Sequence, residues 1–240
     1  RMAEVVRSIC FPSPRRNKCH KQTCQTGGTW GRTRCPSKHQ IKMKVSDFLN
    51  KKAAAKAISF EVLPPLKGNG TAQLFRTIDR LREFSPNYIN ITTHNSEFVY
   101  RQLDNGQYER DRIRRRPGTI AIAAAIQQRY NIPVIPHVIC SGATIESIEY
   151  ELLDLQFLGI QNLLLLRGDK ARDERMFTPT PNGHAHTIDL IKQVNRFNEG
   201  FFADGTPIKH PGESFEYGVA CYPEKHEEAP NIDMDIDFLL

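Results

Sequence analysis

The sequence predicts an α/β protein built as an incomplete (β/α)₈ TIM barrel, in which about five of the eight βα units are present. Two observations support this fold class. Five short apolar runs alternate with segments whose apolar residues recur at helical spacing, and such alternation is typical of a parallel sheet covered by helices. A polar side chain also stands near the end of each run, where a barrel places its active site.

The predicted strands have continuous apolar runs, which is typical of strands buried on both faces. They lie at residues 57–63, 88–93, 132–139, 161–166 and 217–222. The predicted helices lie between these strands, where apolar residues recur along one face. These residues are Leu74, Ile78 and Leu81; Ile120, Ala124 and Ile126; Ile148, Leu152, Leu155 and Leu158; and Ile188, Ile191 and Val194.

The polar residues near the strand ends favour a barrel over an open doubly wound sheet. They are Glu61, Thr92, His137, Asp169 and Glu224. A dinucleotide-binding doubly wound sheet would instead carry a glycine-rich turn after its first strand. Residues 61–65 read Glu-Val-Leu-Pro-Pro at this position, and the pattern Gly-x-Gly-x-x-Gly is absent from the sequence.

Two predicted connections are unusually long. Residues 93–116 are highly charged and end in Arg-Asp-Arg-Ile-Arg-Arg-Arg, whereas residues 198–214 contain three Gly and two Pro. Long loops in a compact domain are often lids or binding loops, and the alternative is a solvated surface excursion. A lid is favoured for the first connection, because it begins directly after Thr92.

Residues 1–42 form a basic leader that differs from residues 43–240, the predicted barrel domain. The leader holds ten Lys or Arg against one Glu, while the whole chain has a net charge of +6, so the barrel domain is mildly acidic. An acidic domain gives no support for a nucleic-acid partner. The leader lacks periodicity and is expected to be disordered, or to be an artefact that precedes a natural start at Met43. A zinc module is the alternative, although no Cys-x₂-Cys pair occurs among its cysteines, which are Cys10, Cys19, Cys24 and Cys35.

Composition also bears on the compartment. The longest apolar runs, such as residues 163–166, fall far short of the roughly 20 residues that span a bilayer, so no membrane segment is expected. Only Cys140 and Cys221 lie outside the leader, which suggests a reducing, cytoplasmic setting.

The last predicted helix begins close to residue 240, and we expect the remaining strands of a complete barrel to lie outside this sequence.

The first motif with chemical potential is Ser-Phe-Glu-Val-Leu-Pro-Pro at residues 59–65. A carboxylate among apolar residues loses hydration, which raises its pKa and lets it hold a proton near neutral pH. Glu61 therefore suits the role of a general acid. The alternative is that Glu61 forms an ion pair with a Lys or Arg across the barrel mouth.

Two further motifs suit a planar cofactor. Residues 166–169 read Leu-Arg-Gly-Asp, in which Gly168 would let a ligand approach the backbone, between the cation of Arg167 and the anion of Asp169. Residues 222–226 read Tyr-Pro-Glu-Lys-His. Tyr222 and His226 could stack on a heteroaromatic ring, or could belong to a capped turn.

Five motifs in order resemble the methylenetetrahydrofolate reductase family, and they lie at residues 59–65, 89–93, 136–144, 166–169 and 222–226. The resemblance implies a TIM barrel that binds FAD and takes a hydride from NADH or NADPH. It implies reduction of a folate substrate, 5,10-methylenetetrahydrofolate, to 5-methyltetrahydrofolate in one-carbon and methionine metabolism. It also implies a homo-oligomer when the protein is full length, and a chain of this extent is expected to bind FAD poorly.

The resemblance assigns roles residue by residue. Glu61 resembles the general acid that helps open the folate imidazolidine ring. Asp169 resembles the acidic residue beside flavin and pterin, whose charge favours a cationic substrate intermediate. The residues that resemble cofactor contacts are Thr92, His137, Arg167, Gly168, Asp169, Tyr222, His226 and Asp235; no metal ligand is implied.

This chain departs from the family pattern in two places. Thr93 and His94 stand where the family has Tyr-Gly, and residues 184–187 lack the Tyr-Ala step of the family. Two alternative functions stay open: another FAD-dependent TIM-barrel oxidoreductase, and a barrel fragment without catalytic competence that serves as an interaction module.

Overall fold

The five expected strands are present and pair in parallel. They are β2 (Ser59–Val62), β3 (Tyr88–Ile91), β6 (Val134–Ile139), β7 (Asn162–Leu166) and β8 (Glu216–Cys221). The computed structural model describes residues 8–10, 44–47, 57–94, 97–170, 174, 176–222, 224–226 and 228–239. Each of the five strands pairs with the next of them along the chain. Because their spatial order follows the chain without a reversal, they form an arc of a barrel rather than a doubly wound sheet.

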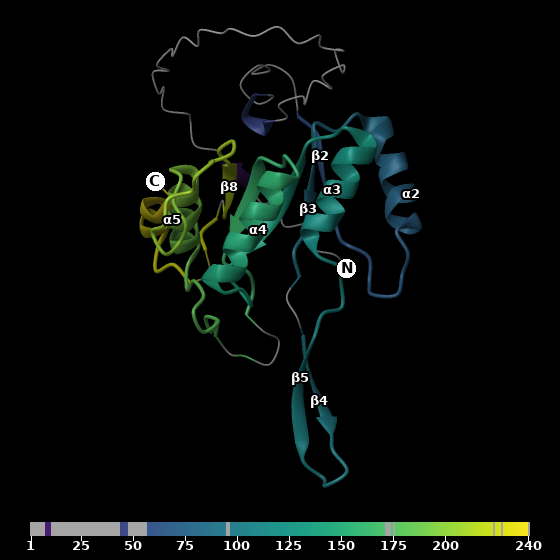
Figure 1. Cartoon of the computed structure of the whole chain (residues 1–240), viewed down its shortest axis with the longest axis vertical. Coiled ribbons are helices and arrows are strands. Elements are labelled where there is room, and N and C mark those ends of the chain that lie inside the picture. The colour runs from purple at the N-terminus through teal and green to yellow at the C-terminus, as the bar shows by residue number, and fades with distance from the viewer. Residues whose placement is uncertain are drawn as a thin grey trace, which may run out of the picture.

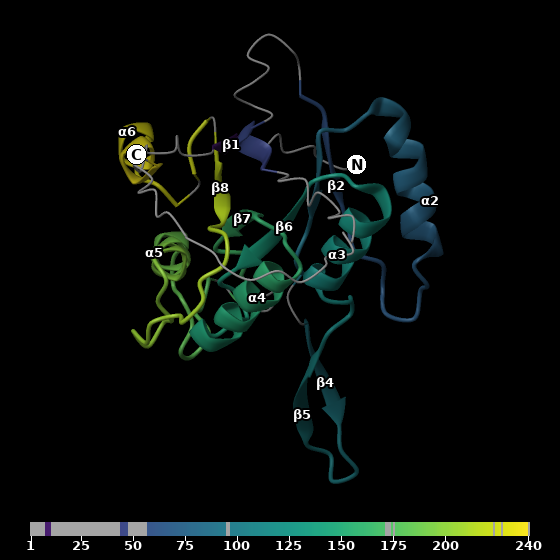
Figure 2. The ribbon, with the colours of Figure 1, turned by 45° about the horizontal axis from the view of Figure 1, so that its top comes forward.

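Four helices cover one face of this sheet (Figure 2). They are α2 (Ala72–Leu81), which continues into the 3₁₀ turn η1 (Arg82–Phe84), α3 (Thr119–Tyr130), α4 (Ile145–Phe157) and α5 (Thr187–Asn198). A fifth helix, α6 (Ile232–Leu239), follows β8. Local chemistry sets the helix boundaries: Thr144 and Ser147 form a capping box at the start of α4, and Asn131 takes a left-handed conformation after α3.

The main hydrophobic core lies between the helices and the sheet. Ile78 on α2, Ile126 on α3, Leu152 on α4 and Val194 on α5 are fully buried in it. Alternate residues of the strands, such as Ile89, contribute the sheet side of this core, as the period of two along a strand requires. The helical spacing seen in the sequence therefore identified most of the buried faces. Leu158 and Ile188, which it also placed there, are 39% and 51% exposed, and Leu190 and Phe197 are buried on α5 instead.

The opposite, inner face of the sheet is closed at its N-terminal end by a helical turn at residues 45–47. Val45 is fully buried and packs with Tyr88, Ile135 and Leu164. The Val45 amide donates a hydrogen bond of 2.9 Å to Asn162 Oδ1. Ser46 Oγ and Lys44 Nζ both contact the Glu216 carboxylate, at 2.7 and 3.3 Å. We call residues 44–47 the plug.

The first long connection, predicted as a lid or binding loop, is a two-stranded antiparallel hairpin. Its strands are β4 (Glu97–Gln102) and β5 (Tyr108–Ile113). Figure 1 shows the hairpin projecting away from the sheet and its helices. The tip turns at Gly106, whose φ is +80°, and the Leu103 amide donates to the Gln107 carbonyl at 2.7 Å. Since the hairpin follows β3, it emerges at the end of the sheet where the candidate site lies.

The second long connection belongs to the scaffold. It joins α5 to the start of β8 and therefore lies at the N-terminal end of the strands, away from the site. Phe202 and Ile208 pack against the main core, and Phe202 lies edge-on to Phe197 with ring centroids 6.4 Å apart. The Ile208 amide donates to the Gly200 carbonyl at 2.7 Å. The lid interpretation does not suit this segment.

Within residues 1–42, only β1 (Ser8–Cys10) is described. It pairs with β8 in antiparallel orientation at the edge of the sheet. The rest of the basic leader, including Cys19, Cys24 and Cys35, lies outside the described residues. The disordered or artefactual leader and its zinc alternative therefore stay predictions, as does the division at residue 42.

Candidate active site

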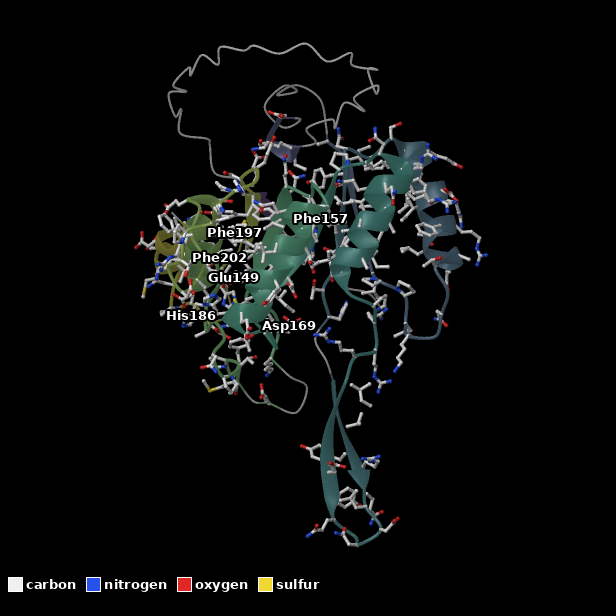
Figure 3. All side chains as sticks on the ribbon, viewed as in Figure 1. Glu149, Phe157, Asp169, His186, Phe197 and Phe202 are labelled. Carbon is white, nitrogen blue, oxygen red and sulfur yellow. The ribbon has the colours of Figure 1, made fainter. Side chains whose placement is uncertain are left out.

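The C-terminal ends of the parallel strands bring the predicted site residues to one edge of the sheet. Glu61 lies on β2, Thr92 follows β3 directly, and Asp169 follows β7. Figure 3 shows Asp169 on the side of the sheet from which the β4–β5 hairpin projects. His137 differs slightly from the expectation, because it lies inside β6 rather than at its end. Residues from successive strands thus share one mouth.

Glu61 and His137 form the centre of this mouth. His137 Nε2 lies 3.7 Å from Glu61 Oε2, which is an ion-pair distance when the imidazole is protonated. The His137 side chain is buried, whereas the Glu61 side chain is 58% exposed. The expectation that apolar neighbours desolvate Glu61 is therefore not met by the described residues. Asn90, the register partner of Glu61 on β3, is also buried, and its Oδ1 has no hydrogen-bond partner among the described residues.

Two adjacent threonines fix the end of β3. Thr92 Oγ1 donates to the Val62 carbonyl at 3.5 Å, which ties β3 to β2. Thr93 Oγ1 donates to the His137 carbonyl and lies 2.7 Å from Thr119 Oγ1 at the start of α3. Thr93 thus joins β3, β6 and α3. The sequence indicated Thr92 as the site residue, and the structure shows that Thr93 has the more extensive contacts.

Arg167, at the end of β7, is held by a bidentate ion pair. Its Nη1 and Nη2 donate to the two carboxylate oxygens of Glu228 at 2.7 and 2.9 Å. The guanidinium also lies over the ring of Phe177, 4.9 Å from the ring centroid. The hydrogen bond and charge of Glu228 raise the pKa of Arg167, and the same hydrogen bond lowers the pKa of Glu228.

Gly168 has a backbone φ of +83°, a conformation that L side chains rarely adopt. This turn leaves the Asp169 side chain exposed, while the Asp169 carbonyl accepts a hydrogen bond of 3.1 Å from Ser141 Oγ. The Arg-Gly-Asp segment therefore presents the paired cation of Arg167 and the exposed anion of Asp169 on either side of Gly168, which has no side chain.

The segment after β8 is organised around His226. The rings of Tyr222 and His226 meet edge to face with centroids 4.9 Å apart. The His226 amide donates to Asp235 Oδ2 at 2.7 Å, and the Glu228 amide donates to His226 Nδ1 at 3.1 Å. Asp235, predicted as a cofactor contact, here anchors the loop to α6. The capped-turn interpretation and the stacking interpretation are thus compatible.

Comparison with known proteins identifies the family of this chain. Residues 44–240 match the family model described as methylenetetrahydrofolate reductase. The chain belongs to this family. The resemblance of its five motifs and its fold class are confirmed, since the family is a TIM barrel and the chain contributes five parallel strands in barrel order.

Relatives of the methylenetetrahydrofolate reductase family occur in yeast, plants and bacteria. The chain is 29% identical over 180 residues to methylenetetrahydrofolate reductase 2 of Saccharomyces cerevisiae, covering 75% of this chain and 25% of the relative. It is 28% identical to methylenetetrahydrofolate reductase (NADH) 1 of Arabidopsis thaliana, covering 74% and 25%. It is 26% identical to 5,10-methylenetetrahydrofolate reductase of Pectobacterium carotovorum, covering 75% and 48%. The match thus spans about a quarter of the yeast and plant relatives and about half of the bacterial one.

His94 is a site residue that the sequence flagged only as a departure from the family pattern. It follows Thr93 at the mouth. Burial and the nearby charge of Arg116 lower the pKa of His94, whereas the charges of Asp169 and Glu61 oppose this shift. The charges of one cation and two carboxylates of the mouth thus act on the pKa of His94, whose side chain is exposed. Arg116 itself donates to the Pro64 carbonyl at the β2 loop.

Residues 184–187 form contacts within the scaffold. His184 Nε2 lies 2.6 Å from Gln193 Oε1 on α5. Gln193 Nε2 in turn donates to the Ile145 carbonyl at the start of α4, at 2.9 Å. Cys140 Sγ donates to the His186 carbonyl at 3.6 Å. These contacts connect residues 184–187 to α4 and α5.

Within the part of the chain that the structure describes, no group of three or more His, Cys, Asp or Glu side chains could hold a metal ion. Among the same residues, no helix has both the length and the apolar character needed to cross a bilayer.

Proposed function

We propose that this protein reduces 5,10-methylenetetrahydrofolate to 5-methyltetrahydrofolate, with FAD as the hydride carrier and a nicotinamide dinucleotide as the donor. The observation that carries the proposal is the gathering of Glu61, His137 and Asp169 at one mouth, in a chain of the methylenetetrahydrofolate reductase family. The plant relatives carry NADH in their names, which supports NADH as the donor. A comparison of flavin reduction by NADH and by NADPH distinguishes the two.

The described residues fit a planar, polar cofactor. Asn90 Oδ1 is a buried acceptor on the inner face without a partner among the described residues, and the side chains of Arg167 and Asp169, which carry opposite charges, stand on either side of Gly168. The residues that we propose to hold FAD are Thr92, His137, Arg167, Gly168, Asp169, Tyr222, His226 and, through the loop that it anchors, Asp235. When bound, FAD supplies a two-electron carrier that accepts and releases a hydride.

The protein residues supply proton transfer and charge. We propose that Glu61 carries the proton that opens the imidazolidine ring of the substrate, with His137 held 3.7 Å away to orient its carboxyl group. Asp169 contributes an exposed negative charge that favours a cationic form of the folate. The charges of Asp169 and Glu61 both act to raise the pKa of His94, against the larger effects of burial and of Arg116.

Glu61→Gln tests the proposal through the two half-reactions. The variant retains shape and hydrogen bonding but has no transferable proton, so flavin reduction by the nicotinamide donor should remain nearly unchanged. Reduction of methylenetetrahydrofolate should fall by at least the ~10² to 10⁴ that a positioned acid contributes. Rapid mixing of flavin-loaded protein with each substrate measures both rates.

Glu83→Gln is the matched control, because Glu83 is an exposed carboxylate on η1, at the opposite end of the sheet. It should leave both rates unchanged. Equal losses in both half-reactions of Glu61→Gln would show that Glu61 is an ion-pairing group rather than a general acid. In the full-length protein, flavin binding without folate reduction would favour another flavin-dependent barrel enzyme, and the absence of flavin binding would favour an interaction module.

We also propose a cytoplasmic location. Only two cysteines, Cys140 and Cys221, lie outside the basic leader, which supports a reducing compartment. Fractionation of cells that express the tagged protein measures its location.

A further inference from the structure

We propose that Glu228 is a positioning residue that holds the guanidinium of Arg167 in place at the mouth of the site. This inference rests on the proposed function, in which Arg167 contacts the flavin. Arg167 Nη1 and Nη2 donate hydrogen bonds to Glu228 Oε2 and Oε1, at 2.7 and 2.9 Å. A two-point contact fixes the plane of the guanidinium as well as its position.

A second contact supports the same role. The ring of Phe177 covers one face of the guanidinium, with 4.9 Å between Arg167 Cζ and the ring centroid. Arg167 is therefore restrained from the side by a carboxylate and from above by an aromatic ring. Its side chain is only 25% exposed, although it carries a charge at the edge of the sheet.

The Arg167–Glu228 pair joins two loops of the site that are far apart in the sequence. Glu228 belongs to the loop between β8 and α6, and its amide donates to His226 Nδ1. Arg167 belongs to the end of β7, 61 residues earlier in the chain. The pair thus connects the Arg-Gly-Asp turn to the loop that carries Tyr222 and His226, which are the two groups of proposed cofactor contacts.

An internal comparison separates this pair from an ordinary surface ion pair. Arg101 and Glu109 also contact at 2.8 Å, but they lie on the projecting hairpin, and the Arg101 side chain is 64% exposed against 25% for Arg167. Exposed pairs of this kind contribute little. Glu109→Gln is therefore a matched control for Glu228→Gln, because it removes the same charge from an Arg–Glu pair whose arginine is exposed.

The first test needs no flavin. An arginine-selective dicarbonyl reagent, with peptide mapping by mass spectrometry, measures the modification rate of each arginine in the native protein. Glu228→Gln should raise the rate at Arg167 severalfold and leave Arg101 unchanged, whereas Glu109→Gln should not alter the rate at Arg167. An unchanged rate at Arg167 in Glu228→Gln would overturn the proposal.

The second test is a double-mutant cycle on flavin affinity. Glu228→Gln and Arg167→Lys should each weaken FAD binding by about tenfold, as expected for loss of a hydrogen bond to a charged group. The double variant should lose little more FAD affinity than either single variant, because both changes disrupt the same Arg167–Glu228 interaction. Additive losses, or tighter binding in Glu228→Gln, would show that Glu228 does not act through Arg167. If the unaltered protein holds no flavin, the proposed function fails, and the modification rates alone decide the role of Glu228.

Discussion

Gly168 shows how a single backbone conformation shapes the mouth. A Cβ at this position would lie 2.9 Å from Ser141 Cβ and 3.4 Å from Ile139 Cβ, and the backbone has a φ of +83°. Gly168→Ala should therefore destabilise the protein by about 1–3 kcal/mol, from steric contact and backbone strain. Urea unfolding measures the loss.

Gly70→Ala is the control for this prediction, because Gly70 is exposed and nothing lies within 4 Å of a Cβ there. It should be neutral or slightly stabilising. Equal unfolding free energies for the two variants would contradict the argument from Gly168.

Cys140 should be chemically inert in the folded protein. The residue is fully buried, and burial raises the pKa of its thiol from 9.0 to about 11. At pH 8 iodoacetamide should modify Cys140 much more slowly in the native protein than in the urea-unfolded protein, because the thiolate is the reacting form. Mass spectrometry of alkylated peptides measures both rates, and equal rates in the two states would contradict the prediction.

The raised pKa of Cys140 also makes the free energy of unfolding depend on pH. Because the pKa of this thiol is higher in the folded protein than in the unfolded chain, folding favours the neutral thiol. The contribution of Cys140 to stability is complete below pH 9 and decreases as the pH rises from 9 towards 11.

At the scale of residues, the sequence predicted the positions of the candidate site residues but not their interaction partners. Glu61, Arg167 and Asp169 could be placed at the mouth, because strand ends are recognisable from apolar runs. The partner of Arg167 could not be predicted, since Glu228 lies 61 residues away and meets it only through the path of a loop. The exposure of Glu61 was also misjudged, because burial depends on segments far away in the sequence.

At the scale of elements, the β4–β5 hairpin should be dispensable for stability. None of its residues belongs to the hydrophobic core of the described chain, and an isolated two-stranded ribbon is marginally stable by itself. Replacing residues 97–113 with a short Gly-Ser linker should leave the melting temperature within about 2 °C of that of the unaltered protein, because the replacement removes no residue from the hydrophobic core. Differential scanning calorimetry measures the shift, and a large decrease would show that the hairpin packs against the body.

The hairpin also shows what sequence patterns can and cannot establish. Its tip contains Asn105 and Gly106, a dipeptide typical of tight hairpin turns, and the preceding residues 98–100 are the strand-favouring Phe, Val and Tyr. This signal was available, but the density of charges around it favoured a long connection without regular strands. The helices and parallel strands were easier, because burial imposes a strong apolar period on them.

At the scale of the whole molecule, the plug links distant parts of the chain. Asn162 is buried, and its Oδ1 accepts the Val45 amide at 2.9 Å. Asn162→Ala should leave that buried donor without its partner and cost about 1–3 kcal/mol. Chemical denaturation followed by circular dichroism measures the change.

Asn105→Ala on the exposed hairpin tip removes the same kind of side chain, whose contacts there are local. It should change the unfolding free energy by less than about 0.5 kcal/mol. Similar losses for both asparagine variants would mean that the plug does not contribute to global stability.

The plug also sets an order of events during synthesis. Val45 and Ser46 reach their partners across 117 and 170 residues of sequence. At about 5–20 residues per second, Glu216 is made roughly 10 to 30 s after Ser46. During that interval Tyr88 and Ile135 lack part of the apolar cluster that they later share with Val45 and Leu164, so the growing chain is most open to aggregation while the ribosome is still extending it.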